Sequence, residues 1–425
     1  MKILWIVNIP LGLISKKLYG KEENGLWMSP LLKEFKMSKE YQLIVATTAA
    51  ISNTFKGEDE GVVYYALPDN VPALYNENKR KNQLAWQTML DEEKPDLIQV
   101  WGTEFTHGLC ALRVSQGIPA ILYMQGYLGS IARYYLAGLT DKELQQSITF
   151  RDITKRDSIR QQQKKFFLST RKEKEMFHLA SSAICENDWC DDSIKAVVPN
   201  MSVYRCPLSV NPVFSQYMWN VENVERHSII CTASGYPLKG LHMVLRAVSI
   251  LKEEYPDIKL YVPGTKMISD GSFQWILRKR GYTKYIERLI KKLNIEKQII
   301  WLGTMSQDKL AEQYSKTRVF VLSSSIENHS SSLKEAMMVG TPSIASAVGG
   351  VPEYVRHGEN GFLYRFEEYE IMARHIKRLF EEDELAVKVS YAGRMDMLKL
   401  HSNTNVFETM VEIYKNIVEE KIKNE

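Results

Sequence analysis

Short apolar runs alternate with longer amphipathic stretches along the first half of the chain. The runs are rich in Ile, Val, Leu and Tyr and are bounded by Gly, Pro, Asn or Asp, which is typical of buried strands. The predicted strands are Ile3–Val7, Gln42–Thr47, Val62–Leu67, Asp96–Trp101, Ala120–Met124 and Ser182–Cys185. The predicted helices between them include Trp27–Phe35, Glu77–Glu93 and His107–Gln116. This alternation predicts right-handed crossovers and a mostly parallel sheet.

The same alternation starts again after an irregular stretch. Residues 206–226 hold two prolines and no clear period, so we place a linker there. The strands predicted after it are Ile229–Ala233, Lys259–Val262, Ile299–Leu302, Val319–Leu322 and Ser343–Ala345. The helices predicted between them are Leu241–Glu254, Phe273–Leu293, Asp308–Tyr314 and Ser332–Val339. We therefore expect an α/β protein with two doubly wound domains, 1–205 and 227–403, which face each other across a cleft and bind ligands at the carboxyl ends of their strands.

Composition and charge exclude several classes of protein. The 425 residues suggest two or three domains at about 150 residues each. Hydrophobic residues at 44% and charged residues at 25% exclude a disordered, collagen-like or simple coiled-coil chain. A net charge of +4 does not demand nucleic acid, and we expect none as a partner. The first apolar run is too short for a signal peptide, no long apolar run could span a bilayer, and the scattered cysteines indicate reduced thiols, so we expect a cytoplasmic protein.

The segment 323–342 carries the candidate chemistry, and it follows the predicted strand Val319–Leu322 directly. Glu327 lies in the loop and Glu335 in the first turns of the next helix, so both carboxylates can face one pocket. Carboxylates there can accept hydrogen bonds from sugar or ribose hydroxyls. A helix amino end also favours an anion such as a diphosphate. The residues predicted to line that end are Asn328, Ser330, Ser331 and Ser332.

This segment resembles the Glu-x7-Glu motif of retaining glycosyltransferases of the GT-B type, in particular family 4. The resemblance continues through residues 340–342, 347–353 and 358–363. Upstream, residues 234–240 look like the phosphate-binding Gly-Arg-x-x-x-x-Lys-Gly element of the family, although Tyr236 stands near the position of its Arg. The resemblance implies a GT-B fold of two Rossmann-like domains. It also implies that a C-terminal helix, 404–421, packs back onto the first domain, and the spacing of its apolar residues gives it a face to bury.

The resemblance also implies roles for individual residues. Lys239 would stabilise the leaving diphosphate, Glu327 would hold donor-sugar hydroxyls and Glu335 would hold the nucleotide ribose. Gln125 stands where the family often has a His near the donor sugar, and Gly25 stands where its N-terminal glycine loop is expected. Other residues expected in the nucleotide-sugar site are Gly235, Gly303 and Thr304.

The function implied by the resemblance is a retaining hexosyltransferase. It would use a nucleotide sugar, with a UDP-sugar expected, and a saccharide or lipid-linked saccharide acceptor in cell-surface or capsular polysaccharide synthesis. No cofactor is expected, because the nucleotide sugar is a substrate. No metal is expected, because the sequence contains no Asp-x-Asp. One alternative is a non-catalytic accessory subunit, which we would expect to lose the paired Glu and the Lys. Another is a GT-B enzyme of a different reaction, such as a phosphorylase or a nucleotide-sugar epimerase.

A further segment, 150–180, interleaves Lys and Arg with Phe. It allows two interpretations: a solvated face of a core-packed helix, or a contact with an acidic lipid surface or a lipid-linked phosphate. Lys33, Lys36 and Lys39 add to the positive charge of the first domain. We therefore expect peripheral binding to an anionic membrane, at its inner face, through the N-terminal domain.

Overall fold

The computed structural model describes residues 1–20, 28–69, 80–115, 117–208, 210–233, 235–268, 271–402 and 406–424. Contacts divide the chain into two compact units. The first comprises residues 1–129, 165–209 and 404–425, and the second comprises residues 130–164 and 210–403. No helix in the described ranges has the length and apolarity needed to cross a bilayer.

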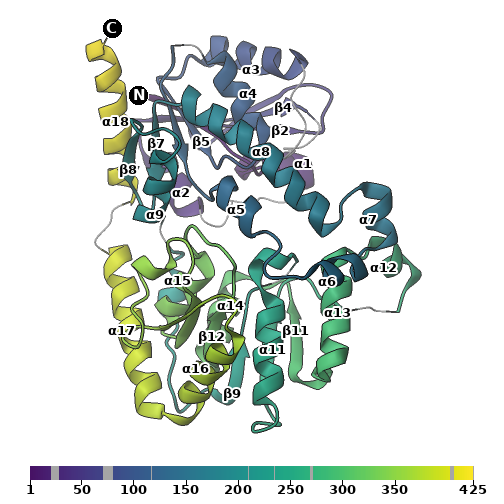
Figure 1. Cartoon of the computed structure of the whole chain (residues 1–425). Helices are drawn as coiled ribbons and strands as arrows, with labels where there is room; N and C mark the ends of the chain where they lie inside the picture. Colours follow the sequence, from purple (N-terminus) through teal and green to yellow (C-terminus); the bar gives the residue numbers. More distant parts are fainter. Residues whose placement is uncertain are drawn as a thin grey trace. The chain divides into compact units, whose positions relative to one another are not determined.

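The first unit is built on a sheet with the strand order β3-β4-β2-β1-β5-β6-β7-β8 (Figure 1). The strands are β1 Lys2–Ile6, β2 Gln42–Ala49, β3 Phe55–Asp59, β4 Val62–Pro68, β5 Leu97–Trp101, β6 Ala120–Tyr123, β7 Ser182–Cys185 and β8 Ser202–Arg205. β3 is antiparallel to β4, and the other described pairings are parallel, which confirms the predicted mostly parallel sheet.

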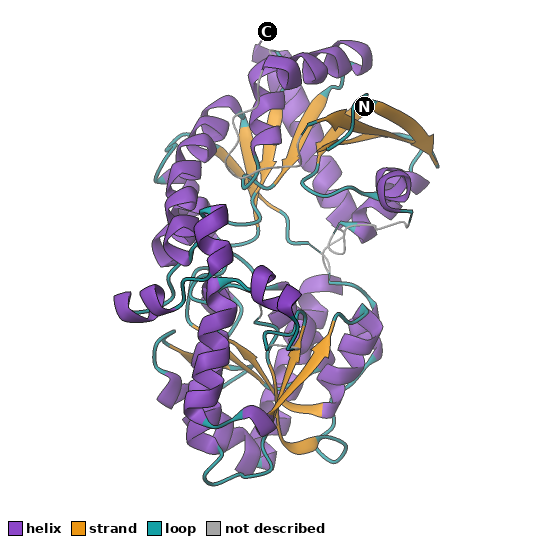
Figure 2. Cartoon of the chain, turned by 90° about the vertical axis from the view of Figure 1, so that its right-hand side faces the viewer, coloured by secondary structure: helices purple, strands orange, loops and turns teal. Residues whose placement is uncertain are grey.

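Helices cover both faces of this sheet (Figure 2). Because alternate residues of a strand point to opposite faces, Trp5 joins one buried cluster and Leu4 joins the other. The first cluster is covered by α1 Gly12–Tyr19, α2 Ser29–Met37 and α18 Val406–Asn424. The second is covered by α3 Arg80–Glu93, α4 Thr106–Val114, α8 Ile159–Leu179 and α9 Asp188–Lys195. Strands buried on both faces explain the continuous apolar runs of the sequence.

The last helix, α18, belongs to the first unit although it ends the chain. Val406, Met410, Ile413 and Ile417 recur along one of its faces and are all buried. Its Tyr414 hydroxyl accepts a hydrogen bond from the Trp5 indole at 3.1 Å. This face of α18 therefore packs on the same side of the first sheet as α1 and α2.

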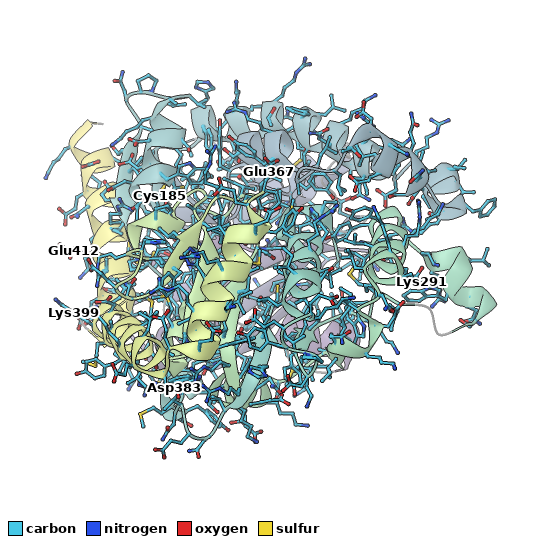
Figure 3. The ribbon with its side chains drawn as sticks, turned by 60° about the horizontal axis from the view of Figure 1, so that its bottom comes forward. Cys185, Lys291, Glu367, Asp383, Lys399 and Glu412 are labelled. Carbon is cyan, nitrogen blue, oxygen red and sulfur yellow. The ribbon has the colours of Figure 1, made fainter. Side chains whose placement is uncertain are left out.

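The second unit has a parallel sheet with the order β11-β10-β9-β12-β13-β14. Its strands are β9 Glu225–Ile230, β10 Lys259–Pro263, β11 Ile299–Gly303, β12 Thr317–Leu322, β13 Ser343–Ser346 and β14 Phe362–Tyr364. Its helices are α10 Val213–Gln216, α11 Leu241–Leu251, α12 Phe273–Arg278, α13 Gly281–Leu293, α14 Gln307–Lys316, α15 Ser331–Val339, α16 Tyr369–Glu381 and α17 Asp383–Ser402. Arg318 is buried at 1% exposure and pairs with Asp383, the first residue of α17 (labelled in Figure 3). Two open α/β sheets of this kind make up the predicted Rossmann-like architecture.

Residues 130–164 contact the second unit, whereas the sequence assigns them to the first domain. They contain most of α5 Leu128–Tyr134, then α6 Asp141–Gln146, α7 Phe150–Lys155 and the start of α8. The buried ring of His242 in α11 bonds the carbonyl oxygen of Ala137 at 2.9 Å. Arg246, one turn further along α11, pairs with Glu143. The predicted linker, residues 206–226, is not irregular throughout, because it contains α10 and the start of β9.

Candidate functional site

Three loops of the second unit meet at the carboxyl edge of its sheet, after the neighbouring strands β9, β12 and β13. Gly240 has φ +69°, and a Cβ there would lie 1.7 Å from the carbonyl oxygen of Ser323. Gly349 has φ +52°, and a Cβ there would lie 1.8 Å from the carbonyl oxygen of Glu327. The loops can approach this closely because both positions are glycine.

Hydrogen bonds fix the three loops to one another. The backbone N–H of Ser325 donates to the carbonyl oxygen of Leu238 at 2.7 Å. The hydroxyl of Ser323 donates to the carbonyl oxygen of Lys239 at 2.8 Å. The Ser346 hydroxyl donates to the carbonyl oxygen of Ser324 at 2.6 Å. The side chains that these loops carry are therefore held on a rigid frame.

Lys239 and Glu327 form an ion pair on this frame. The Lys239 Nζ lies 2.5 Å from Glu327 Oε1, which also accepts a hydrogen bond from the Ser324 hydroxyl at 2.5 Å. Burial disfavours the charged amine, but the negative charge of Glu327 outweighs this effect and raises the pKa of Lys239 above its usual value. The lysine is thus a fixed cation with two of its three N–H donors still available beyond this bond.

The amino end of α15 lies next in the same loop. Its N-cap is Ser330, whose hydroxyl accepts a hydrogen bond from the backbone N–H of Leu333 at 3.4 Å. Ser331 is exposed and Ser332 is half-buried, so the first turn of the helix is open to a ligand, while Asn328 is buried. The first N–H groups of a helix have no acceptor within the helix and carry a partial positive charge. This end of α15 can therefore bind an anionic group.

Glu335 lies one turn further along α15, on the same side as Ser332. It is half-buried, and burial raises its pKa to about 7. None of the described residues forms an ion pair with it that would offset this burial. Its carboxyl group is therefore available to accept hydrogen bonds from a ligand.

The remaining predicted residues of this unit lie along the same sheet edge. Gly235 has φ +94° in the loop after β9, with no atom within 4 Å of a built Cβ. Gly303 ends β11 with φ +71°, and Thr304 follows it, exposed. Because β10 separates β11 from β9, these two residues lie away from Lys239. Gly25 falls outside the described residues.

Gln125 follows β6 in the first unit and belongs to a second polar cluster. Its amide oxygen accepts a hydrogen bond from Asn8 Nδ2 at 3.2 Å. A Cβ on Gly102 would lie 2.2 Å from Glu104 Oε2 and 3.0 Å from Gln125 Oε1, so these two side chains meet at this glycine. Burial raises the pKa of Glu104 to about 7. Among the described residues, Asn8 Oδ1, Glu104 Oε2 and Gln125 Nε2 are buried without a hydrogen-bond partner, which suits them to bind hydroxyl groups.

Sequence reasoning missed several residues of these two sites. The hydroxyl of Tyr354 accepts a hydrogen bond from the backbone N–H of Ser330 at 3.1 Å and so steadies the start of α15. Asn8 was missed because its partner Gln125 is distant in the sequence, whereas Ser324 lies only three residues before Glu327, to which its hydroxyl donates. Glu104 could have been found in the sequence, because it is a carboxylate two residues after the glycine that follows a buried strand.

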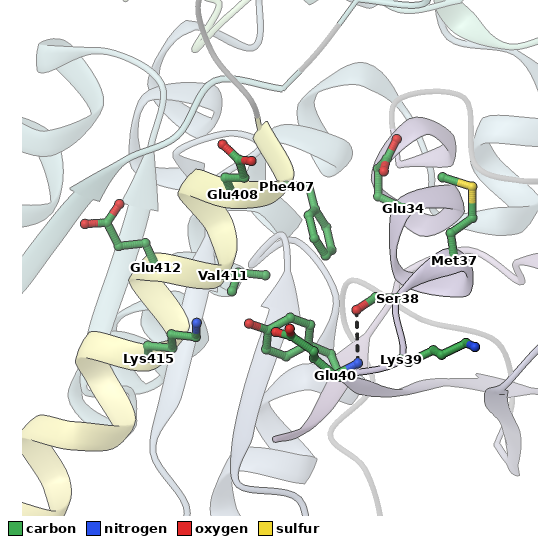
Figure 4. A pocket seen from close by; sticks show the side chains of 11 residues that line it. Glu34, Met37, Ser38, Lys39, Glu40, Phe407, Glu408, Val411, Glu412 and Lys415 are labelled. Atoms are coloured by element: carbon green, nitrogen blue, oxygen red, sulfur yellow. Dashed lines mark hydrogen bonds between the residues drawn. The ribbon is translucent and has the colours of Figure 1, made fainter.

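A cavity of about 630 Å³ lies elsewhere in the first unit (Figure 4). It is lined by α2, the residues before β2, and α18, with Glu40, Phe407 and Lys415 among the lining side chains. It lies at the amino end of β2, whereas open α/β sheets bind ligands at the carboxyl ends of their strands. We therefore assign it no part in the candidate site.

The cysteines are buried thiols without disulfides. Cys185 (Figure 3) and Cys190 come nearest to each other, with their sulfurs 3.0 Å apart. Over the described residues, no group of three or more His, Cys, Asp or Glu is placed to hold a metal ion.

Lys239, Glu327 and Glu335 lie within the part of the chain that matches a known family model. Residues 219–396 match the family model described as glycosyl transferases group 1. The chain is 30% identical over 159 residues to a D-inositol 3-phosphate glycosyltransferase of Streptomyces griseus, covering 37% of this chain and 32% of the relative. It is 29% identical over 133 residues to an N-acetyl-alpha-D-glucosaminyl L-malate synthase of Bacillus anthracis, and this match covers 31% of this chain and 34% of the relative. The matched region thus spans about a third of these curated relatives.

Solved structures resemble the whole chain. A sucrose-phosphate synthase of Thermosynechococcus elongatus aligns with a TM-score of 0.70 and 16% identity, over 98% of this chain and 99% of that one. Anabaena HepE in complex with UDP and glucose aligns with a TM-score of 0.63 and 14% identity, over 98% and 100%. At such identities the likeness shows the fold alone, and that fold is GT-B.

Proposed function

We propose that this protein is a glycosyltransferase that transfers a sugar from a nucleotide-diphosphate sugar. The observation that supports this most is the cation Lys239, held by Glu327 on the same rigid frame as the amino end of α15. Both lie within the region matched by the glycosyl transferases group 1 model. A cation beside a helix amino end is a site suited to a diphosphate.

The site explains how the leaving group could be stabilised. Departure of a nucleoside diphosphate builds negative charge on its oxygens. Lys239 and the N–H groups at the start of α15 are already in place to receive that charge, without reorganisation during the reaction. Glu327 keeps the lysine positioned through one hydrogen bond and would hold donor-sugar hydroxyls with its other oxygen. Glu335 would accept hydrogen bonds from the ribose.

Finer features of the reaction are part of the same proposal. We propose retention of configuration, transfer of a hexose and a UDP-sugar donor, in line with the Glu-x7-Glu resemblance. HepE, whose fold this chain shares, was solved with UDP-glucose. We propose a saccharide or lipid-linked saccharide as acceptor, in polysaccharide synthesis on the cytoplasmic side. The polar cluster of Asn8, Glu104 and Gln125 offers groups that suit saccharide hydroxyls.

A panel of nucleotide sugars tests this function. The purified full chain is mixed with UDP-, GDP-, ADP- and dTDP-sugars and a set of saccharide acceptors, and release of nucleoside diphosphate is measured. We expect release from one nucleotide class, with the anomeric configuration of the product retained by NMR. Binding of a nucleotide sugar without any release would favour the accessory-subunit alternative instead.

Turnover should survive chelation of metal ions. Lys239 and the α15 amino end supply the positive charge that a divalent cation supplies to a diphosphate in other sites. The measurement is the rate of nucleotide release with and without EDTA, at matched ionic strength. Complete loss of activity with EDTA, restored by manganese, would contradict this prediction.

A further inference from the structure

The exposed surface of α7 and of the start of α8 combines cations with large apolar side chains. Phe150 and Ile153 of α7 are 64% and 68% exposed. The exposed cations of residues 150–164 are Lys155, Arg156, Arg160 and Lys164, of which Arg160 pairs with Asp141. A helix that faces only water normally keeps its apolar residues on the covered side. This surface therefore differs from an ordinary solvated face.

The acidic residues of this segment do not offset the cations, because they are buried or already paired. They are Asp152, which is buried, and Asp157, which pairs with Arg151. Within the described part of the chain, Lys155, Arg156 and Lys164 form no ion pair. The positive charge of these three residues is thus available to an external anion.

A distant segment adds to the same surface. Helix α12 packs beside α7 within the second unit (Figure 1). It contributes Leu277, 44% exposed, and the exposed Arg278. A Cβ on Gly281, just after α12, would lie 2.8 Å from Asp152 Oδ2, so α7 is seated closely against this part of the chain. The apolar and cationic side chains are therefore presented by a firmly anchored element.

We propose that the exposed side chains of α7, of the start of α8 up to Lys164, and of α12 form a docking surface for an anionic lipid bilayer. Lipid phosphates would attract the cations, and the apolar side chains between them would enter the interfacial region. A nucleic-acid duplex would use the cations but leaves the exposed aliphatic side chains of Ile153 and Leu277 without a role. The proposal does not depend on sugar transfer.

Lys36 of α2 forms ion pairs with Asp59 and Glu60 at 3.0 and 2.8 Å, so its charge is not available to an external anion. The sequence predicts membrane contact through the N-terminal domain, whereas the surface proposed here lies on residues of the second unit.

The test is flotation of the full chain, without substrates, with phosphatidylcholine vesicles of increasing phosphatidylglycerol content. The Debye length falls from about 10 Å at 0.1 M salt to about 3 Å at 1 M. We therefore expect binding that rises with the anionic lipid fraction at 0.1 M salt and is lost at 1 M. Absence of binding at 0.1 M, or equal binding to pure phosphatidylcholine, would overturn the proposal.

Matched variants locate the surface. The triple variant Lys155→Gln, Arg156→Gln, Lys164→Gln should lower the partition coefficient about a hundredfold. The control triple variant Lys291→Gln, Lys292→Gln, Lys297→Gln removes equal charge from exposed positions on and after α13 and should change it less than about twofold (Lys291 is labelled in Figure 3). Equal loss in both triple variants would show an effect of net charge alone and overturn the assignment.

A second pair of variants tests the apolar part. Phe150→Ser with Ile153→Ser should weaken vesicle binding about tenfold or more. The control, Tyr391→Ser with Met395→Ser, removes exposed apolar groups from α17 and should leave binding unchanged. All four residues are well exposed, so folding should be preserved, and thermal unfolding checks this. If the α7 pair has no effect and the protein instead binds a DNA duplex through the same cations, the surface is a nucleic-acid site and the proposal is wrong.

Discussion

Replacing Lys239 by Met should lower the turnover number for sugar transfer about a hundredfold to a thousandfold. Removal of one preorganised group that faces developing negative charge typically costs this much in kcat. Lys239 is such a group, because its Nζ is held at 2.5 Å by Glu327 and its raised pKa keeps it charged. The measurement is the initial rate of nucleotide release at saturating donor, compared with the wild type.

Controls separate this effect from a loss of folding. Lys297→Met removes an exposed lysine of the same unit and should leave the rate unchanged. Lys239→Arg keeps the charge and should retain more activity than Lys239→Met. Because removal of Lys239 leaves Glu327 without its cation, thermal unfolding is measured for each variant. Wild-type turnover in a folded Lys239→Met protein would remove this lysine from the mechanism.

Replacing Glu335 by Gln should weaken binding of the nucleoside diphosphate by about 1–3 kcal/mol, or about 5- to 150-fold in Kd. The carboxylate of Glu335 would lose its charged hydrogen bonds to the ribose hydroxyls, while its shape is conserved. Calorimetric titration with UDP measures the effect. Glu312→Gln, a half-exposed carboxylate on α14, is the matched control. Unchanged binding in Glu335→Gln would place the ribose elsewhere.

The raised pKa of Glu335 also predicts that the affinity for the nucleotide depends on pH. Burial raises the pKa of Glu335 to about 7, so much of this carboxyl is protonated below neutral pH. The ionised form accepts hydrogen bonds from hydroxyls more strongly than the protonated form does. Affinity for the nucleotide should therefore rise as the pH increases from about 6 to about 8. Phosphate titration affects both proteins alike, so the difference between wild type and Glu335→Gln isolates this contribution, and identical profiles would contradict it.

The sequence predicts the strands that are buried on both faces, because such strands appear as continuous apolar runs. β3, with the sequence Phe-Lys-Gly-Glu-Asp, was missed because it is a polar edge strand. The single helix predicted over 273–293 is wrong, and the structure has α12 and α13 instead. The break comes at Gly281, where the chain packs against Asp152 and Ser147 of a distant segment. No local pattern carries that information.

The candidate site likewise has features that the sequence predicts and features that it does not. Glu327, Glu335 and Lys239 were found because their spacing relative to a strand and a helix is visible in the sequence. The ion pair between Lys239 and Glu327 was not predicted, because 88 residues separate these two side chains in the sequence. The assignment of residues 130–164 to the second unit depends on contacts such as Arg246 with Glu143, which lie 103 residues apart in the sequence. Long-range partners of this kind decide the electrostatics of the site and the unit to which a helix belongs.

The most direct test of the central claim is a crystal structure of the full chain with a nucleoside diphosphate bound. The nucleotide should lie on the second unit, with its diphosphate at Lys239 and the amino end of α15 and its ribose at Glu335. This position follows from a fixed cation, a helix amino end and an uncompensated carboxyl group on one sheet edge. A nucleotide lodged wholly among residues 1–200 would contradict the account.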